Sequence, residues 1–264
     1  QGPVTEDNFR IVDAPVGEPG EGEVLVRNEW LSLDPYMRGR MSDAKSYVPP
    51  VQIGEVMVGE AVGEVVASRD PRFAAGDKVL ASTGWQLYGV VRADNLHRID
   101  ATRAPASCYL GVLGMPGMTA WFGLFDLAAP KPGETVVVSA ASGAVGSVVG
   151  QLAKIHGCRA VGIAGGKAKC DYVVQELGFD ACVDHKGGAL HHDLRTACPD
   201  GVDVHFENVG GVVLDTMLGL MNRFSRIVIC GLIAEYDATA PYAYTRPGSV
   251  LVNRIRMQGM IVLD

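Results

Sequence analysis

The first 110 residues alternate short apolar runs with turn residues. Runs rich in β-branched residues are bounded by Gly and Asp, and they occupy residues 22–33, 59–68, 76–82 and 88–99. Short runs at this spacing are typical of antiparallel strands joined by turns. The pattern therefore predicts a small antiparallel, barrel-like domain at the start of the chain.

The pattern changes at about residue 128, where strand-like and helix-like segments begin to alternate. An apolar run at 136–139 precedes apolar residues at helical spacing up to Ile155, and Gly157 marks the stop. Further helices are expected at about 168–177, 189–197 and 211–222, between strand-like runs at 159–164, 180–183, 202–207, 226–230 and 256–263. Because parallel strands need crossover connections, these six strands predict an α/β fold with a doubly wound, Rossmann-like sheet.

Composition fits packed domains. With 264 residues, of which 48% are hydrophobic, the chain can form one large core or two ordinary ones. We expect Trp30, Trp85 and Trp121 to lie in the core. A net charge of −7 without any run of Lys or Arg predicts no nucleic-acid partner.

The cysteine pattern predicts a reducing compartment. The six cysteines are scattered without a CxxC pair, which is typical of reduced thiols rather than a disulfide framework. No stretch of about 18 apolar residues occurs, and the first residues lack a basic segment followed by an apolar one. We therefore expect a soluble cytoplasmic protein without a membrane partner.

A glycine-spaced loop joins the first Rossmann strand to its helix. The loop reads ASGAVG over 141–146, with Ala141 at the first glycine position and Gly143 and Gly146 at the others. Backbone N–H groups at such a helix start can hold a pyrophosphate, so a strand-loop-helix context favours a dinucleotide site. The alternative is a tight turn of the kind that any α/β protein can contain.

The end of the second strand indicates the cofactor. NAD-binding folds place an acidic residue there to bind the ribose 2′-hydroxyl, but this chain has Gly165 and Gly166, followed by Lys167 and Lys169. A carboxylate would repel a 2′-phosphate, whereas an ammonium group attracts it. The sequence therefore predicts NADPH, although one of the two lysines is expected to be merely solvated.

Several motifs resemble the medium-chain dehydrogenase/reductase superfamily, in its zinc-free branch of prostaglandin reductases, plant alkenal double-bond reductases and bacterial curcumin-reductase-like enzymes. These motifs span the chain: LSLDPYMRGRM (31–41), GMPGMTAWFGL (114–124), AASGAVGSVVGQLAK (140–154), FENVGG (206–211) and CGLIAEY (230–236). The resemblance implies a GroES-like substrate domain over 1–115 and a Rossmann NADP-binding domain over 116–264. It also implies that relatives continue past residue 264, with a helix and a segment returning to the first domain.

The resemblance implies cofactor contacts throughout the second domain. Lys169 is expected at the 2′-phosphate, together with His185, which stands where relatives commonly have tyrosine. The other implied contacts are Gly143, Ala144, Val145, Gly146, Asn208, Cys230, Gly231, Leu232, Ile233, Ala234, Glu235, Tyr236, Met260, Ile261 and Val262.

No metal is expected. The position of the histidine in the GHE motif of zinc-dependent relatives is Gly59 here, and no cluster of four cysteines exists for a structural site. His191 and His192 are adjacent on a predicted helix and face different directions, so we interpret them as solvated.

The chemistry implied is hydride transfer to the β-carbon of an α,β-unsaturated ketone or aldehyde, with negative charge developing on the carbonyl oxygen. Tyr236 follows the fifth strand and is the candidate donor to that oxygen or the proton source; a loop tyrosine packing on the cofactor is the equal alternative. Tyr47, Tyr242 and Tyr244 are candidate walls of the substrate pocket, although a single aromatic residue is more often ordinary packing.

Two other functions stay open at this point. A quinone reductase of the same superfamily shares the AxGxxG loop, although DPYMRGRM argues against it. A non-catalytic NADPH-binding protein is the alternative from a different class. A homodimer is expected because many relatives join their Rossmann sheets edge to edge.

Overall fold

The chain divides into two compact units in this computed structural model, which describes residues 2–262. Unit 1 comprises Gln1–Gly114 and unit 2 comprises Met115–Asp264. Among the described residues, no helix is long and apolar enough to cross a membrane. Each unit has its own sheet and its own buried residues, and each is described by itself.

Unit 1 is built on a five-stranded sheet in the order β4-β1-β2-β3-β5, with every neighbouring pair antiparallel. Its strands are β1 (Glu23–Leu31), β2 (Ala61–Ser68), β3 (Lys78–Ala81), β4 (Tyr88–Arg92) and β5 (Leu96–Arg98). Short helical turns lie at η1 (Glu6–Asn8), α1 (Tyr36–Gly39), η2 (Ala93–Asn95) and η3 (Ala106–Leu110). The sheet forms an antiparallel half-barrel around buried Val24, Val26, Val65 and Val79, which confirms the predicted fold class of this unit.

Unit 2 contains a six-stranded parallel sheet in the order β11-β10-β9-β6-β7-β8. Its strands are β6 (Thr135–Ser139), β7 (Arg159–Ala164), β8 (Ala181–Asp184), β9 (Val202–Glu207), β10 (Met221–Ile229) and β11 (Arg256–Gly259). Counted within this unit, the order is 3-2-1-4-5-6 read from the far edge, which is the Rossmann arrangement. The predicted doubly wound sheet is therefore confirmed, and its switch point lies between β6 and β9.

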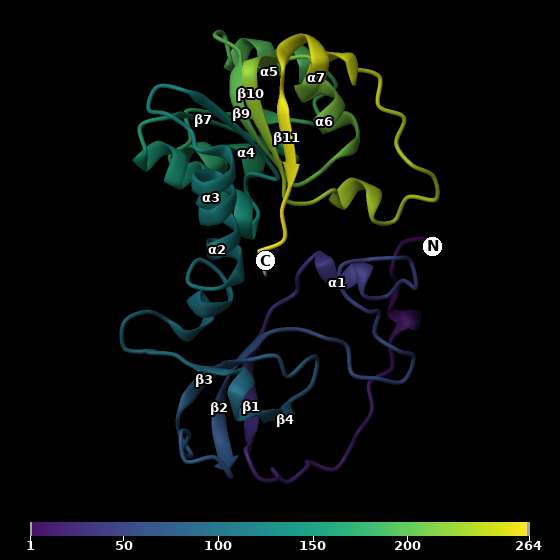
Figure 1. Cartoon of the computed structure of the whole chain (residues 1–264), viewed down its shortest axis with the longest axis vertical. Helices are drawn as coiled ribbons and strands as arrows, with labels where there is room; N and C mark the ends of the chain where they lie inside the picture. The colour runs from purple at the N-terminus through teal and green to yellow at the C-terminus, as the bar shows by residue number, and fades with distance from the viewer. Residues whose placement is uncertain (1, 263–264) are drawn as a thin grey trace. The chain divides into compact units, whose positions relative to one another are not determined.

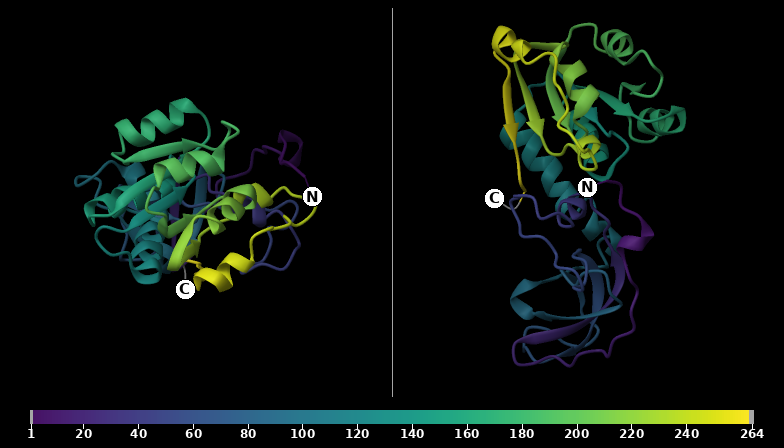
Figure 2. Two further views of the ribbon diagram at one scale, coloured as in Figure 1. Left: turned by 90° about the horizontal axis from the view of Figure 1, so that it is seen from above. Right: turned by 90° about the vertical axis from the view of Figure 1, so that its right-hand side faces the viewer.

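Helices cover both faces of this sheet (Figures 1 and 2). They are α2 (Met115–Trp121), the π-helical η4 (Phe122–Ala128), α3 (Ala144–Ile155), α4 (Lys167–Gln175), α5 (Leu190–Ala197), α6 (Gly211–Leu218), η5 (Ile233–Glu235) and α7 (Gly248–Asn253). Successive side chains of β6 point to opposite faces of the sheet. Val136 and Val138 pack with η4, α3 and α4, whereas Val137 packs with α5 and α6. This alternation is what a parallel strand buried on both faces requires.

The end of one helix and the burial of two tryptophans differ from the sequence-based expectations. The helix expected to reach residue 222 ends at Leu218, and β10 begins at Met221, with Phe224 in the left-handed region at φ 62°.

Trp30 and Trp121 are 55% and 57% exposed, so their predicted place in the core is wrong. The last residues of β1 are exposed, and the Trp121 ring packs on Phe125, with ring centroids 4.6 Å apart. Trp85 is half-buried and stacks on Phe9.

Candidate nucleotide site

The glycine loop after β6 is shaped by close backbone packing. Ala140 adopts φ 49°, and its carbonyl oxygen accepts the Gly143 N–H at 2.8 Å. A Cβ at Gly146 would lie only 2.4 Å from that same oxygen, so α3 can begin this close to the strand only with glycine there. Gly146 thus has the helix-packing role that the third glycine of a dinucleotide loop has.

The first turn of α3 offers an anion site. Gly143 is the N-cap, without a side chain, and both Gly143 and Ala144 are exposed, while Val145 is half-buried. The first N–H groups of a helix have no intrahelical partner, and the helix dipole adds positive potential there. A pyrophosphate could therefore approach the backbone of 143–145 directly.

The end of β7 has no acidic side chain and is flanked by cations. Lys167 is paired with Asp171 at 2.6 Å, four residues along α4. Lys169 is exposed, and its ammonium group forms no ion pair with any residue from 2 to 262. A Cβ at Gly165 would stand 2.9 Å from His185 Nε2, so the imidazole lies directly over this glycine. The structure thus places His185 beside the position where an NAD-type acid would stand.

A buried polar network lies beneath Asn208, at the carboxyl ends of β6 and β9. The Ser139 hydroxyl donates to Glu207 Oε1 at 2.6 Å and accepts the Asn208 N–H at 2.7 Å. The Asn208 side-chain amide donates to the Ser139 carbonyl oxygen at 2.8 Å. Glu207 Oε1 also accepts the N–H groups of Val209 and Gly210 at 2.5 Å and 3.1 Å. Glu207 therefore fixes the backbone of the loop that carries Asn208.

Glu207 is paired with His205, and both side chains are 0% exposed. His205 Nδ1 lies 3.1 Å from the Val137 carbonyl oxygen, which can only accept, so Nδ1 carries a proton. Burial alone would raise the pKa of Glu207, but His205, Ser139 and Val209 outweigh it and hold this pKa below its usual value. His205 Nε2 lies 2.9 Å from Glu207 Oε2, so the two buried side chains form a hydrogen-bonded pair in which the carboxylate is ionised.

Backbone hydrogen bonds hold the segment 230–236 against the same loop, which follows β9. The N–H groups of Cys230 and Gly231 donate to the Glu207 carbonyl oxygen at 2.9 Å and 3.1 Å, and Ile233 N–H donates to the Asn208 carbonyl oxygen at 3.2 Å. Burial raises the pKa of the Cys230 thiol to about 12, with Glu207 adding to the effect, so this thiol stays protonated. The Tyr236 hydroxyl lies by this segment, 3.2 Å from where a Cβ at Gly231 would stand.

The aromatic pair predicted for the substrate wall lies at the start of α6. Tyr242 and Tyr244 pack edge to face with centroids 4.9 Å apart. The Tyr244 hydroxyl donates to Glu235 Oε1 at 2.5 Å and accepts the Gly211 N–H at 3.3 Å. Burial and the bond to Glu235 raise the pKa of Tyr244 to about 12. Tyr244 is thus occupied in joining η5 to α6, whereas the Tyr242 ring lies beside Gly211.

The last described residues contribute mainly backbone. Met260 is buried, and its sulfur would lie 2.8 Å from a Cβ at Gly123, so its side chain packs into the core next to η4. Ile261 is half-buried, and Val262 lines a small apolar pocket of about 240 Å³ with Met118, Trp121 and Phe122. A cofactor contact at 260–262 would therefore fall on backbone groups or on the two later side chains.

The residues around Gly59 in unit 1 do not fit a catalytic zinc. A Cβ at Gly59 would lie 3.1 Å from Met37 Cε and 3.2 Å from both Leu31 Cδ1 and Trp85 Cδ1, so apolar side chains fill the space of the missing histidine. Burial, reinforced by the charge of Asp34, raises the pKa of the adjacent Glu60. Over residues 2–262, no group of three or more His, Cys, Asp or Glu side chains could hold a metal ion.

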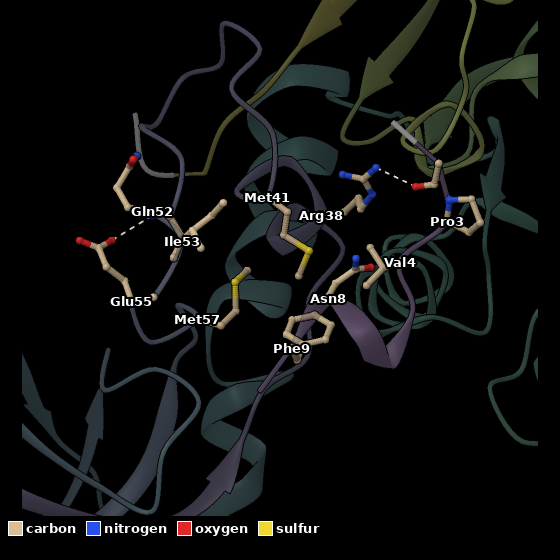
Figure 3. A pocket seen from close by; sticks show the side chains of 13 residues that line it. Pro3, Val4, Asn8, Phe9, Arg38, Met41, Gln52, Ile53, Glu55 and Met57 are labelled. Carbon is tan, nitrogen blue, oxygen red and sulfur yellow. Dashed lines mark hydrogen bonds between the residues drawn. The ribbon is translucent and has the colours of Figure 1, made fainter. Parts of the chain in front are cut away.

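A cavity in unit 1 was not foreseen from the sequence. It has a volume of about 540 Å³ and lies between the N-terminal segment and the loop at 51–57. Figure 3 shows Phe9, Met41, Ile53 and Met57 around it, together with the Arg38 guanidinium, which donates to the Gly2 carbonyl oxygen at 2.9 Å. Tyr47, the residue predicted for a pocket wall in this unit, is 56% exposed and does not line the cavity.

The Rossmann sheet and the glycine loop at the start of α3 define a dinucleotide-binding class of protein. Comparisons with known proteins agree. Residues 1–99 match the family described as N-terminal domain of oxidoreductase, and residues 144–264 match the one described as zinc-binding dehydrogenase. The chain is 51% identical to NADPH-dependent curcumin reductase of Escherichia coli, over 98% of this chain and 76% of that enzyme.

Two further similarities narrow the branch. The chain is 44% identical to the 2-alkenal reductase (NADP(+)-dependent) of Nicotiana tabacum, over 93% of this chain and 72% of that one. It superimposes on the crystal structure of CurA from Vibrio vulnificus in complex with NADPH with a TM-score of 0.94 and 48% identity, covering 100% of this chain and 80% of that one. The chain belongs to the medium-chain dehydrogenase/reductase superfamily, in the zinc-free branch of curcumin, alkenal and prostaglandin reductases.

Proposed function

We propose that this protein uses NADPH to reduce the carbon–carbon double bond of α,β-unsaturated ketones or aldehydes. One observation carries the proposal: the dinucleotide loop at 143–146 is followed by a second strand whose end, at 165–166, has no acidic residue of its own and is flanked by Lys169 and His185. The similarity to NADPH-dependent reductases of such substrates supports the same conclusion.

Residues of unit 2 hold the cofactor in this proposal. The backbone of 143–146 binds the pyrophosphate, Lys169 and His185 bind the 2′-phosphate, and Asn208 with the segments 230–236 and 260–262 borders the nicotinamide. The bound cofactor supplies a hydride to the substrate β-carbon. Tyr236 donates a hydrogen bond to the oxygen on which the enolate charge develops, or supplies the proton. No metal takes part, because the residues around Gly59 do not fit one.

The substrate is a small molecule with an apolar body. Tyr47 and Tyr242 provide aromatic surface, with Tyr244 holding Tyr242 in place. The cavity of unit 1 has a volume within the range of about 300–1,000 Å³ that is typical of ligand pockets. Its mixture of thioether, aliphatic and aromatic side chains suits an apolar portion of such a molecule.

The proposal is tested by following NADPH absorbance with enones, alkenals and 1,4-quinones. We expect turnover with enones or alkenals and weaker turnover with quinones. A protein that turns over quinones faster than any enone would instead be a quinone reductase. Tight NADPH binding without oxidation by any acceptor would indicate a non-catalytic NADPH-binding protein.

Lys169→Ala is expected to weaken NADPH binding roughly ten- to a hundredfold while leaving NADH binding nearly unchanged. A charge-assisted hydrogen bond to the 2′-phosphate contributes about 1.5–3 kcal/mol, and NADH has no such phosphate. Lys167→Ala is the matched control, because Lys167 is already paired with Asp171. Both variants are titrated with both cofactors; equal losses of NADPH and NADH in Lys169→Ala would remove this residue from the 2′-phosphate site.

A homodimer in the cytoplasm completes the proposal. Strand β11 forms the edge of the sheet, and all four of its residues are exposed, so its outer side can pair with a second copy (Figure 2). The six cysteines are free thiols, as a reducing compartment would keep them. Sedimentation equilibrium should give twice the chain mass, and a monomer at micromolar concentration would contradict the dimer.

A further inference from the structure

The strand ends of β7 and β8 lie side by side, and their loops meet over Gly165. Ala164 and Asp184 are register partners, so the residues after each strand share one edge of the sheet. His185 and Lys186 both fold across Gly165: a Cβ placed there would lie 2.9 Å from His185 Nε2 and 3.1 Å from Lys186 Cε. A side chain at 165 would therefore require these two exposed side chains to move aside.

Asp184 fixes this arrangement. Its Oδ1 atom accepts the N–H of Gly166 at 2.8 Å and the N–H of Lys186 at 2.9 Å, which ties the β8 loop to the start of α4. These two bonds hold the pKa of Asp184 below its usual value, so its carboxylate is ionised. The negative charge of Asp184 thus lies beside the place where the 2′-phosphate is proposed to bind.

The charges around this place favour a second cation. Lys167 and Asp171 neutralise each other, and Lys169 alone would only balance Asp184. A phosphate monoester carries about −1.5 to −2 charges at neutral pH, so a second cation beside Lys169 would strengthen its binding relative to a hydroxyl. Lys186 restores a net positive charge, and its ammonium group forms no ion pair within residues 2–262.

We propose that Lys186 is a second specificity-determining residue, which binds the 2′-phosphate of NADPH together with Lys169. The proposal rests on the proposed use of NADPH. Gly165 has no side chain and so leaves room for the methylene groups of Lys186. Asp184 positions the Lys186 backbone. This explains why the site can discriminate against NADH without an aromatic residue at 185.

The test titrates NADPH, NADH and adenosine 2′,5′-bisphosphate against wild type, Lys186→Ala, Lys186→Arg and the control Lys167→Ala. We expect Lys186→Ala to weaken NADPH and the bisphosphate roughly ten- to a hundredfold and NADH less than twofold, the loss of one charge-assisted hydrogen bond. Lys186→Arg should keep most of the affinity, since arginine binds phosphate well.

The outcomes separate the two claims. If the wild type prefers NADPH and Lys186→Ala keeps the same NADPH-to-NADH ratio, the role of Lys186 is refuted while the proposed function stands. If the wild type itself binds NADH as tightly as NADPH, the proposed cofactor is wrong. Equal weakening of all ligands, including NADH, by Lys186→Ala would mean that the residue only supports the loop and would also overturn the inference.

Discussion

Tyr236→Phe is expected to lower kcat about a hundredfold while changing the KM for NADPH little. Tyr236 ends the segment 230–236, and its hydroxyl lies beside Gly231 near the start of that segment. The loop after β9 holds the segment in place through the bonds to Glu207 and Asn208. As hydride reaches the β-carbon, charge develops on the carbonyl oxygen, and a donor that is already positioned stabilises that charge most in the transition state. Loss of one such donor corresponds to roughly 3 kcal/mol.

Steady-state kinetics with several enones measures this effect. Tyr172→Phe is the matched control, because Tyr172 is 46% exposed on α4 and removal of its hydroxyl should leave kcat unchanged. A lower kcat with an unaltered KM for NADPH identifies an interaction made in the transition state. Wild-type turnover by Tyr236→Phe on every active enone would leave the tyrosine with a packing role against the cofactor.

The elements of unit 2 were predictable because their pattern is strong. Runs such as VVVS and RAVGIA are apolar on both faces, as central parallel strands must be, and the glycine loop lies between a strand and a helix. The first part of β10 was not predictable. Residues 222–226 contain Asn, two Arg and Ser instead of an apolar run, and the register with β9 shifts between Met221 and Arg226, with Phe224 at positive φ.

The residues of the site that depend on strand order were missed. Lys186 follows β8, and its closeness to Gly165 exists only because β7 and β8 pair. Ser139 and Glu207 are 68 residues apart in the chain and meet where β6 and β9 are neighbours. One signal was present in the sequence: VDVHFE carries His205 and Glu207 on a strand that must be buried, and buried charges need partners.

That pair gives the largest expected effect on stability. Glu207→Ala is expected to lower the free energy of unfolding of unit 2 by about 3–5 kcal/mol, the range found when one partner is removed from a buried pair that includes a charged group. The substitution leaves His205 Nε2 without its carboxylate partner and removes the acceptor of Ser139, Val209 and Gly210. Urea unfolding measures the loss, and hydrogen exchange should show faster exchange at the amides of Val209 and Gly210.

Glu207→Gln separates hydrogen bonding from charge. Its amide oxygen can still accept from Ser139, Val209 and Gly210, while its NH₂ group faces His205 Nε2 and His205 Nδ1 stays beside the Val137 carbonyl oxygen. We therefore expect this variant to lose less than about 1.5 kcal/mol, the net value of a typical hydrogen bond. Glu176→Ala, at an exposed position on the C-terminal cap of α4, should change stability by no more than about 0.5 kcal/mol. If Glu207→Ala were as stable as this surface control, with the amides of 209 and 210 equally protected, the network would not be what holds the loop of Asn208.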